Sequence, residues 1–210
     1  MPISHQHHDL DRVHLQRALS YAAEYLRSQR AELVIVAVGG AVNTILLRSR
    51  ESTHDVDFFL PDSGSGEARL LEQAALAAEA RSSIPLGGDW LNNSTSLYIP
   101  RNLRQELSRE ATAQGDIVFQ QRGLTVLAAP WIYALCAKIE RLGGHRRRRY
   151  DLTDAATYLE RYNSRHRGRP VEYTFLVEKA RHYGTSINAE VCREVDAAYV
   201  KRYHRHGIQT

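Results

Sequence analysis

The sequence lacks long apolar runs, although apolar residues make up 43% of its 210 positions. A membrane-spanning helix needs about 20 consecutive apolar residues, and no stretch of the chain approaches that length. The first residues also lack the charged and then apolar pattern of a secretion signal. These absences predict a protein that has no membrane partner and resides in the cytoplasm.

Cysteine is scarce, and neither sign of charge dominates. Cys136 and Cys192 are the only two cysteines, and neither belongs to a CxxC pair. Neither a disulfide-stapled scaffold nor a cysteine-based zinc site is therefore indicated. We interpret both residues as buried thiols in a reducing compartment. The formal net charge of +4 permits acidic partners without requiring one.

The most informative stretch of the chain lies between residues 34 and 60. Val34 to Val38 is a short β-branched apolar run, which favours a buried strand over a helix. Gly39 and Gly40 follow, and the absence of a Cβ lets the backbone turn sharply and approach a ligand closely. Residues 41–48 have the length and apolar spacing of a helix, whose first amides are a potential anion site.

Two carboxylates come next in the sequence. Asp55 and Asp57 belong to a second predicted strand. Side chains alternate along a strand, so both carboxylates should face the same side, about 6–7 Å apart. Such a pair suits Mg²⁺, which binds carboxylate oxygens together with substrate phosphates and keeps several waters.

The order of these features resembles the signature of a known superfamily. A Gly-Gly turn and a helix precede the motif Arg50-x-x-Thr53-x-Asp55-Val56-Asp57. This order is similar to that of the nucleotidyltransferase fold, the superfamily that includes DNA polymerase β. In particular, it resembles nucleotidyltransferase-like proteins related to the AbiE-type bacterial toxins. The resemblance implies an α/β (α+β) fold with a small mixed sheet flanked by helices, followed by a C-terminal helical bundle.

In that superfamily a third carboxylate from a later strand completes the metal site. Asp116 is the natural candidate, because it opens the first strand of a predicted hairpin over residues 116–120 and 124–128. Glu106 and Glu110 are alternatives on a predicted helix. A solvated aspartate without a metal role is an equally good interpretation of Asp116.

One motif of the resembled proteins is incomplete in this chain. A W-L-N-D-like sequence occurs in uncharacterised relatives of the fold, and here it reads Trp90, Leu91, Asn92, Asn93. A carboxylate role at the last position is therefore lost. We expect Trp90 to pack in the core rather than to stack on a base.

The second half of the resemblance, which overall covers roughly residues 33–160, lies in predicted helices. Lys138 and Arg141, followed by Asp151 and Asp154, are similar to a K-x-x-R … D-x-x-D pattern of the toxin-related family. The resemblance implies that Lys138 reaches a nucleoside triphosphate. Alternatively, Lys138 or Arg141 forms a structural ion pair with the two aspartates.

Between these two pairs lies an unbroken basic run, Arg146 to Arg149. Such a run is usually a solvated loop. It can also contact RNA or another polyanion, and binding would then depend steeply on salt.

The sequence thus predicts a nucleotidyltransferase-like core over residues 1–128 and a C-terminal helical region over 129–210, packed on the core. The expected function is metal-dependent transfer of a nucleoside monophosphate from an NTP to RNA, a protein or a small molecule. In this interpretation Asp55, Asp57 and Asp116 hold two Mg²⁺ ions, Gly39 and Gly40 cradle phosphate oxygens, Arg50 and Lys138 offset charge, and Thr53 orients the loop or a phosphate.

Two alternatives remain open at this stage. The chain could keep the fold only to bind nucleotide or RNA without catalysis, as the Asn93 departure favours. The cleft could also serve different chemistry on a small organic substrate, with His54 as general base. His54, however, alternates away from the two aspartates on the predicted strand.

Overall fold

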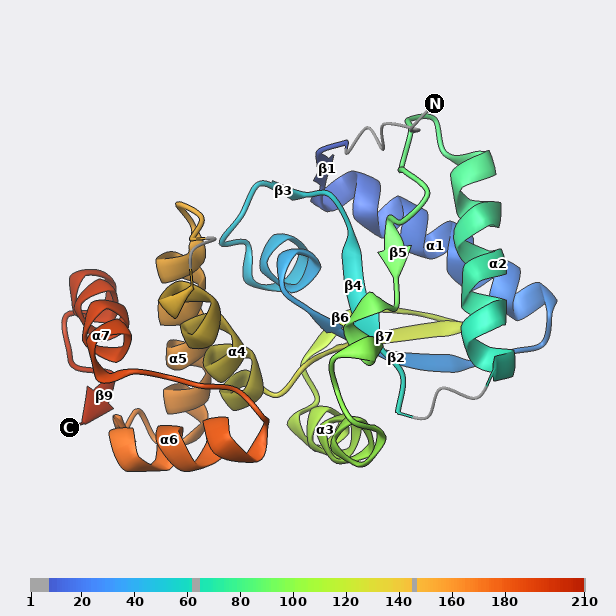
Figure 1. Ribbon diagram of the computed structural model, residues 1–210. Helices are drawn as coiled ribbons and strands as arrows, with labels where there is room; N and C mark the ends of the chain where they lie inside the picture. The colour runs from blue at the N-terminus through green and yellow to red at the C-terminus, as the bar shows by residue number, and fades with distance from the viewer. Residues whose placement is uncertain (1–7, 62–64, 145–146, 210) are drawn as a thin grey trace. The chain divides into compact units, whose positions relative to one another are not determined.

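The computed structural model describes residues 8–61, 65–144 and 147–209 (Figure 1). The chain divides into two compact units, Met1–Ala129 (unit 1) and Pro130–Thr210 (unit 2). Unit 1 combines helices with a mixed sheet, and unit 2 is mainly helical. The predicted α/β class is confirmed at this level.

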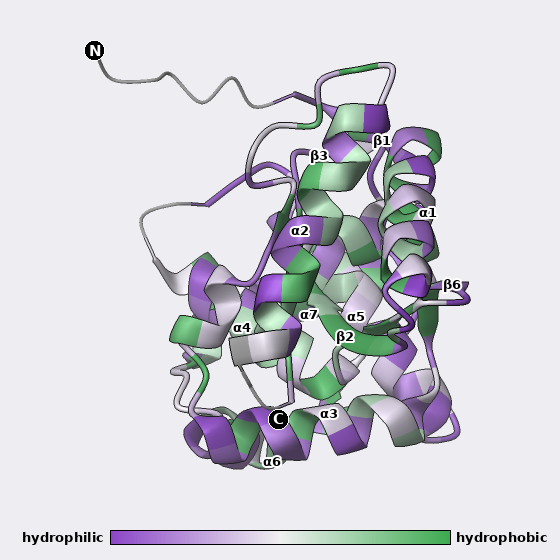
Figure 2. Ribbon diagram, turned by 90° about the vertical axis from the view of Figure 1, so that its right-hand side faces the viewer, coloured by the Kyte–Doolittle hydropathy of each residue, from purple (hydrophilic) through white to green (hydrophobic). Residues whose placement is uncertain are grey.

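The sheet of unit 1 has five strands in the order β5-β4-β2-β7-β6. The central strand β2 is parallel to β7 and antiparallel to β4, which makes the sheet mixed. β6 and β7 form the predicted hairpin, and β5 pairs in parallel with β4 at the opposite edge. The strands are β2 Leu33–Val38, β4 Val56–Phe59, β5 Leu91–Asn92, β6 Ile117–Gln121 and β7 Leu124–Ala128. β2 consists only of apolar residues, which are green in Figure 2.

Helices flank this sheet, with α1 drawn above it and α3 below it in Figure 1. Asp11 caps α1, because its side chain accepts a hydrogen bond from the backbone N–H of His14 at 2.9 Å. The indole of Trp90 is 1% exposed and donates to the carbonyl of Ala75 in α2, so the prediction that Trp90 packs in the core is confirmed. The helical elements are α1 Arg12–Ser28, the π-helix η1 Val42–Leu47, α2 Ser65–Arg81, the 3₁₀-helix η2 Ser94–Leu97 and α3 Arg101–Gln114.

A two-stranded pairing ties the loop before β4 to the start of the described chain. β1, Leu10–Asp11, runs antiparallel to β3, Ser52–Thr53. Leu10 is fully buried, and Thr53 is 8% exposed. This pairing fixes the direction in which the chain enters β4.

Unit 2 packs its helices around aromatic and aliphatic side chains. Trp131 and Tyr158 stack with ring centroids 6.0 Å apart, and both are 2% exposed. Cys136 and Cys192 are free thiols in this core, as predicted, and burial raises their pKa to about 12 and about 11. The elements are α4 Trp131–Gly143, α5 Asp151–Arg165, β8 Val171–Glu172, α6 Tyr173–His182, α7 Ala189–Tyr203 and β9 Ile208–Gln209. No helix in the described parts of the chain is long and apolar enough to cross a membrane.

Candidate functional site

The Gly-Gly turn and the acidic strand meet at one end of the sheet. Val38, the last residue of β2, pairs with Asp57 of the antiparallel strand β4. Gly39 follows Val38 directly, so the turn begins beside the strand that carries the aspartates. The sequence pattern placed these features one after another, and the strand register places them next to each other.

Gly40 and Thr53 are in close contact within this corner. A Cβ added to Gly40 would lie 2.0 Å from Oγ1 of Thr53 and 2.8 Å from its Cβ. Glycine is therefore required at position 40 for steric reasons. Gly39 adopts a left-handed conformation with φ +65°, which glycine tolerates at little cost. Thr53 thus packs the loop before β4 against the turn.

Asn43 organises the same corner and was not anticipated from the sequence. Its side chain is fully buried. Its Nδ2 donates to the Gly39 carbonyl at 3.0 Å, and its Oδ1 accepts from the hydroxyl of Ser49 at 3.1 Å. Asn43 therefore joins the start of the turn to the residues that follow η1. The available signal was the polar pair Asn43 and Thr44 in the first turn of a helix whose other residues are apolar.

Asp55 and Asp57 are half-buried, whereas Val56 between them is fully buried. Asp57 lies in β4 and Asp55 directly precedes that strand, so the shared face of the two carboxylates stays a prediction with which this burial pattern agrees. The backbone N–H of Val56 donates to the carbonyl of Trp90 at 2.6 Å, which joins this strand to the segment before β5. The aspartates therefore sit on backbone that is held from both sides.

The neighbour of Asp57 on β5 is an amide. Asn92 pairs with Asp57 in the parallel register of β4 and β5. The Oδ1 of Asn92 accepts from the backbone N–H of Ser94 at 3.2 Å. Within the described ranges, no group of three or more His, Cys, Asp or Glu residues has a geometry that could hold a metal ion.

The structure does not bring Asp116 to the other two aspartates. Asp116 precedes β6, and its carbonyl accepts from the backbone N–H of Ala128. β6 is three strands from β4 in the sheet, a separation of about 14 Å at the usual strand spacing. Ligands of one Mg²⁺ ion lie about 2.0–2.1 Å from it, so Asp57 and Asp116 are too far apart to share one. The strand order therefore argues against Asp116 as the third ligand, and Asp55 and Asp57 remain as the candidate pair.

The pair by itself fits Mg²⁺ delivered with a nucleotide. Mg²⁺ is usually held by one or two carboxylates plus substrate phosphates, and it keeps several waters. Asp57 at the start of β4 and Asp55 just before it are the carboxylates that would supply this donor set. The donors suit one ion, and the chemistry of a second ion would need the missing third carboxylate.

Arg50 and His54 both precede the aspartates in the sequence, and their surroundings differ. Arg50 is half-buried in the segment between η1 and β3, next to Ser49, which is tied to Asn43. His54 is exposed, and its Nδ1–H donates to the carbonyl of His8 at 3.3 Å and lies 3.5 Å from Asp9. His54 therefore contacts the N-terminal segment, in keeping with its alternation away from the aspartates.

Lys138 belongs to unit 2, where two carboxylates hold its ammonium group. Its Nζ donates to Asp151 at 2.9 Å and to Asp154 at 3.1 Å. Both aspartates are fully buried, and Lys138 is 6% exposed. Burial acts to raise the pKa of Asp151, but the backbone N–H of Arg148, the bond from Lys138 and the charge of Arg141 outweigh it and lower this pKa. The expected structural ion pair is confirmed.

The basic run is partly engaged within unit 2. Arg147 forms an ion pair with Glu194, and Arg148 donates to the hydroxyl of Tyr150 at 2.7 Å. Arg149 is exposed. Arg146 lies outside the described residues. The run therefore offers less positive charge to a partner than its sequence indicates.

Two exposed apolar residues beside the acidic strand were also missed. Leu97 and Tyr98 are 83% and 84% exposed at the end of η2, which packs against β4. No pattern in the sequence distinguishes these two residues, because they lie in an irregular segment without periodicity. An exposed tyrosine next to a candidate nucleotide site is a potential stacking surface.

Comparison with known proteins gives a family without an assigned activity. No curated protein and no solved structure matches the chain. A family model described as "Domain of unknown function (DUF7582)" matches residues 8–206, nearly all of the described chain. The chain therefore belongs to the DUF7582 family.

Proposed function

We propose that this chain is a metal-dependent nucleotidyltransferase that moves a nucleoside monophosphate from an NTP to an acceptor. The observation that carries the proposal is the pairing of Val38 with Asp57. It puts the Gly39–Gly40 turn and the aspartate pair at the same end of neighbouring strands. The mixed sheet flanked by helices is compatible with a nucleotidyltransferase fold, as the sequence resemblance implies.

Each group in this corner has a role that follows from its chemistry. Asp55 and Asp57 hold Mg²⁺, which when bound neutralises phosphate charge and polarises the oxygens of the reacting group. The backbone of Gly39 and Gly40 approaches the phosphates, because no side chain intervenes. Arg50 offsets the charge that develops on departing pyrophosphate. Thr53 keeps the loop against the turn, as its contact with Gly40 supports.

The decisive measurement is calorimetric titration of ATP, GTP, CTP and UTP, each with and without Mg²⁺. Wild type should bind one of them in a Mg²⁺-dependent manner. Asp57→Asn should weaken that binding by about tenfold or more, since even indirect support of a metal is worth 10–100-fold. Asp116→Asn is the matched control and should leave the affinity unchanged, because Asp116 lies three strands away.

Any of three results would contradict the proposal. Binding that is equally tight in Asp57→Asn would exclude the aspartate pair as the metal ligands. An equal loss of nucleotide affinity in Asp57→Asn and Asp116→Asn would show that the sheet order does not define the site. Absence of binding to all four nucleotides by wild type would reject the nucleotide itself and favour a small organic substrate.

A second candidate function is nucleotide binding without transfer. It is favoured by Asn92, an amide that pairs with Asp57 where a carboxylate could contribute to a metal site. On this account wild type binds Mg²⁺-NTP but releases no pyrophosphate. Asn92→Asp should then tighten Mg²⁺ binding, since a third anionic ligand joins the pair. Pyrophosphate release by wild type would exclude this candidate, and unchanged Mg²⁺ affinity in Asn92→Asp would remove the role of position 92.

A further inference from the structure

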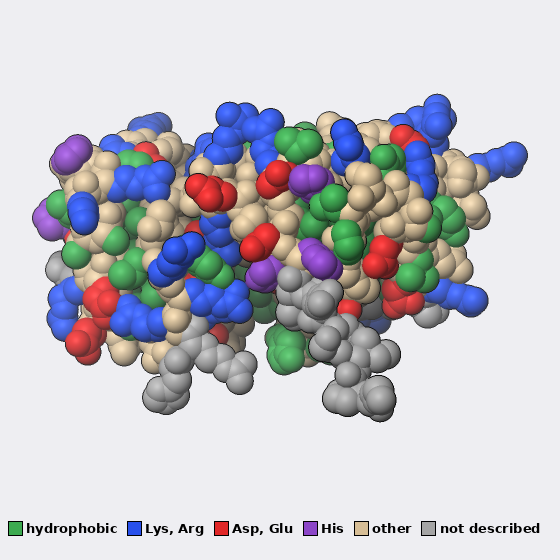
Figure 3. Space-filling model, turned by 90° about the horizontal axis from the view of Figure 1, so that it is seen from above, with side chains coloured by type: hydrophobic (Ala, Val, Ile, Leu, Met, Phe, Trp, Pro, Cys, Tyr) green, Lys and Arg blue, Asp and Glu red, His purple; other side chains and the backbone are tan. Residues whose placement is uncertain are grey.

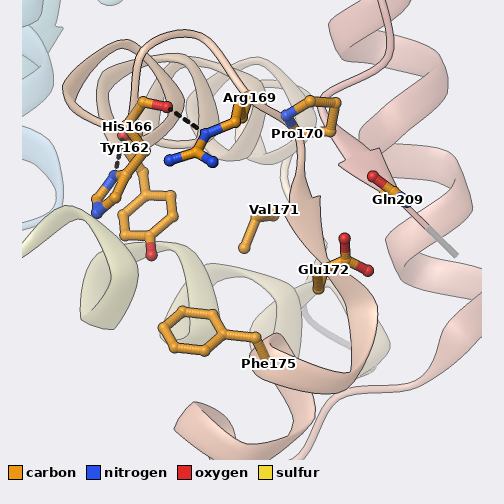
Figure 4. Close-up of a pocket in the computed structure, with 8 residues that line it drawn as sticks. All are labelled: Tyr162, His166, Arg169, Pro170, Val171, Glu172, Phe175 and Gln209. Atoms are coloured by element: carbon orange, nitrogen blue, oxygen red, sulfur yellow. Dashed lines mark hydrogen bonds between the residues drawn. The ribbon is translucent and has the colours of Figure 1, made fainter.

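Unit 2 contains a pocket of about 370 Å³ that is remote in sequence from the aspartate strand. Its volume lies within the range of small-molecule sites, about 300–1,000 Å³. Figure 4 shows the rings of Tyr162 and Phe175 and the side chain of Val171 facing a common space. The lining comes from α5, β8, α6 and β9: Tyr162, His166, Arg169, Pro170, Val171, Glu172, Phe175 and Gln209.

The walls of this pocket are aromatic. Tyr162 stacks on His166 with centroids 4.1 Å apart, and the planes of Tyr162 and Phe175 are inclined by 25° with centroids 6.3 Å apart. His166 Nδ1–H donates to the Tyr162 carbonyl at 2.8 Å, which leaves Nε2 as an acceptor. The parts of these faces that the three rings do not cover for one another suit a flat aromatic ring, because stacking requires little beyond a π surface.

The rim of the pocket is polar and presents donors and acceptors of different kinds. Arg169 supplies a cation, Glu172 an anion and Gln209 an amide, and all three are exposed. A nucleobase has this complement on its edge, since it carries ring N–H or amino donors next to carbonyl or ring-nitrogen acceptors. An aliphatic ligand would make no use of these groups.

The backbone around the pocket is fixed. The carbonyl of Asn163, a fully buried residue, accepts from the N–H groups of His166 and Gly168, each at 2.8 Å. Its Nδ2 donates to the carbonyl of Gly207 at 2.8 Å. Gly168 takes a left-handed conformation in this turn, with φ +70°. A preformed site binds with less loss of conformational entropy than a mobile one.

Positive charge is concentrated around the same pocket. Residues 161–169 include four arginine side chains, all exposed: Arg161, Arg165, Arg167 and Arg169. Arg165 stands three positions after Tyr162 on α5 and so shares its face, and His166 follows as the C-cap of this helix. Basic residues are common at a helix C-terminus, but the charge here extends past the helix to Arg169, which lines the pocket.

The charge of the whole unit agrees with this local excess. Unit 2 has sixteen Lys and Arg against nine Asp and Glu, a formal charge of +7, whereas unit 1 has twelve against fifteen, or −3. Figure 3 shows one face of the molecule, where Lys and Arg side chains in blue are spread among Asp and Glu side chains in red. A polyanion should therefore be attracted to unit 2.

From these observations we infer that the pocket binds one base of a single-stranded nucleic acid, with Arg165 and Arg169 contacting phosphates on either side. The basic residues extend beyond the pocket, so the ligand is an oligonucleotide rather than a mononucleotide. A duplex does not fit, because its bases are stacked on each other and cannot enter the pocket. This site is independent of nucleotide binding in unit 1.

The test is fluorescence anisotropy of labelled 12-nucleotide U₁₂ and dT₁₂ strands with the full chain, in EDTA so that Mg²⁺-nucleotide binding does not contribute. Phe175→Leu should weaken binding about tenfold by removing one stacking face. Arg165→Ser with Arg169→Ser should reduce the slope of log K against log salt by about 1.4, at about 0.7 per phosphate contact. The charge-matched control is Arg193→Ser with Lys201→Ser, two exposed residues of α7 outside the pocket lining.

A second readout reports whether a base of the strand stacks in the pocket. A 2-aminopurine in the strand should lose fluorescence on binding to wild type and not to Phe175→Leu, and thermal unfolding should show that this variant is folded. An equal change of the salt slope in the control double variant and in the Arg165/Arg169 double variant would overturn the site. Quenching of 2-aminopurine that survives in Phe175→Leu would also overturn it. Tight binding of U₁₂ but not dT₁₂ supports the site and identifies RNA as the ligand, and the reverse identifies DNA.

Discussion

Gly40 occupies a position where the chain has no room for a side chain. A Cβ there would lie 2.0 Å from Oγ1 of Thr53, a buried residue whose backbone is paired in β3. We expect Gly40→Ala to lower the free energy of unfolding by about 1–3 kcal/mol, the usual cost of overpacking. Urea denaturation of the full chain measures this change.

Gly66 provides the control for this substitution. It lies near the start of α2, and a Cβ there meets nothing within 4 Å. Gly66→Ala should be neutral or raise the stability by up to about 1 kcal/mol, because alanine favours helix more than glycine does. A Gly40→Ala protein as stable as Gly66→Ala would mean that the turn is not packed against Thr53.

At the scale of elements, one buried lysine joins two helices of unit 2. Lys138 lies in α4, and its partners Asp151 and Asp154 lie in the first turn of α5. Replacing Lys138 with methionine leaves two buried carboxylates without their cation, which should cost about 3–5 kcal/mol in unfolding free energy. Arg141→Met is the control: Arg141 Nε is 3.9 Å from Asp151 and the side chain is 42% exposed, so we expect a loss of at most about 1 kcal/mol.

The same ion pair gives unit 2 a defined acid sensitivity. The pKa of Asp151 is lower in the folded chain than in the unfolded chain. At pH values near and below the ordinary pKa of this carboxyl group, the unfolded chain therefore binds a proton more readily than the folded chain does. The contribution of Asp151 to stability is therefore complete above its ordinary pKa of 3.8 and is lost as pH falls towards the lowered value. Denaturation followed at pH 5, 4 and 3 should show this loss in wild type. A stability that is flat over this range would contradict it.

The elements differ in how far the sequence determines them. The hairpin β6–β7 was predictable, because Gly123 marks its turn with φ +106° between two apolar runs. The helix at 41–48 was predicted in position, but the periodicity does not distinguish the π-helix that forms over Val42–Leu47. The parallel pair of Val171 and Ile208 has no local signal, because two-residue strands 37 positions apart depend on tertiary packing.

At the scale of the whole molecule, the candidate site was also predictable only where its residues are close in sequence. Gly39, Gly40, Asp55 and Asp57 were found because they are close in sequence and meet through one strand pairing. Asp116 was assigned to them on resemblance, and its distance depends on the order of four strands, which the local pattern does not contain. The pocket of unit 2 was not foreseen for a similar reason, since its walls come from residues 162–175 and from Gln209.

The pairing of β8 with β9 has a consequence for synthesis on the ribosome. Unit 1 has every strand of its five-stranded sheet once Ala128 has been made, so it can fold while translation continues. Unit 2 needs Gly207, whose carbonyl accepts from Asn163, and Ile208, which pairs with Val171. Unit 2 therefore gains these two contacts only when residues 207–209 emerge. The two halves should thus become protease-resistant in sequence, the first during translation and the second only after it has passed residue 209.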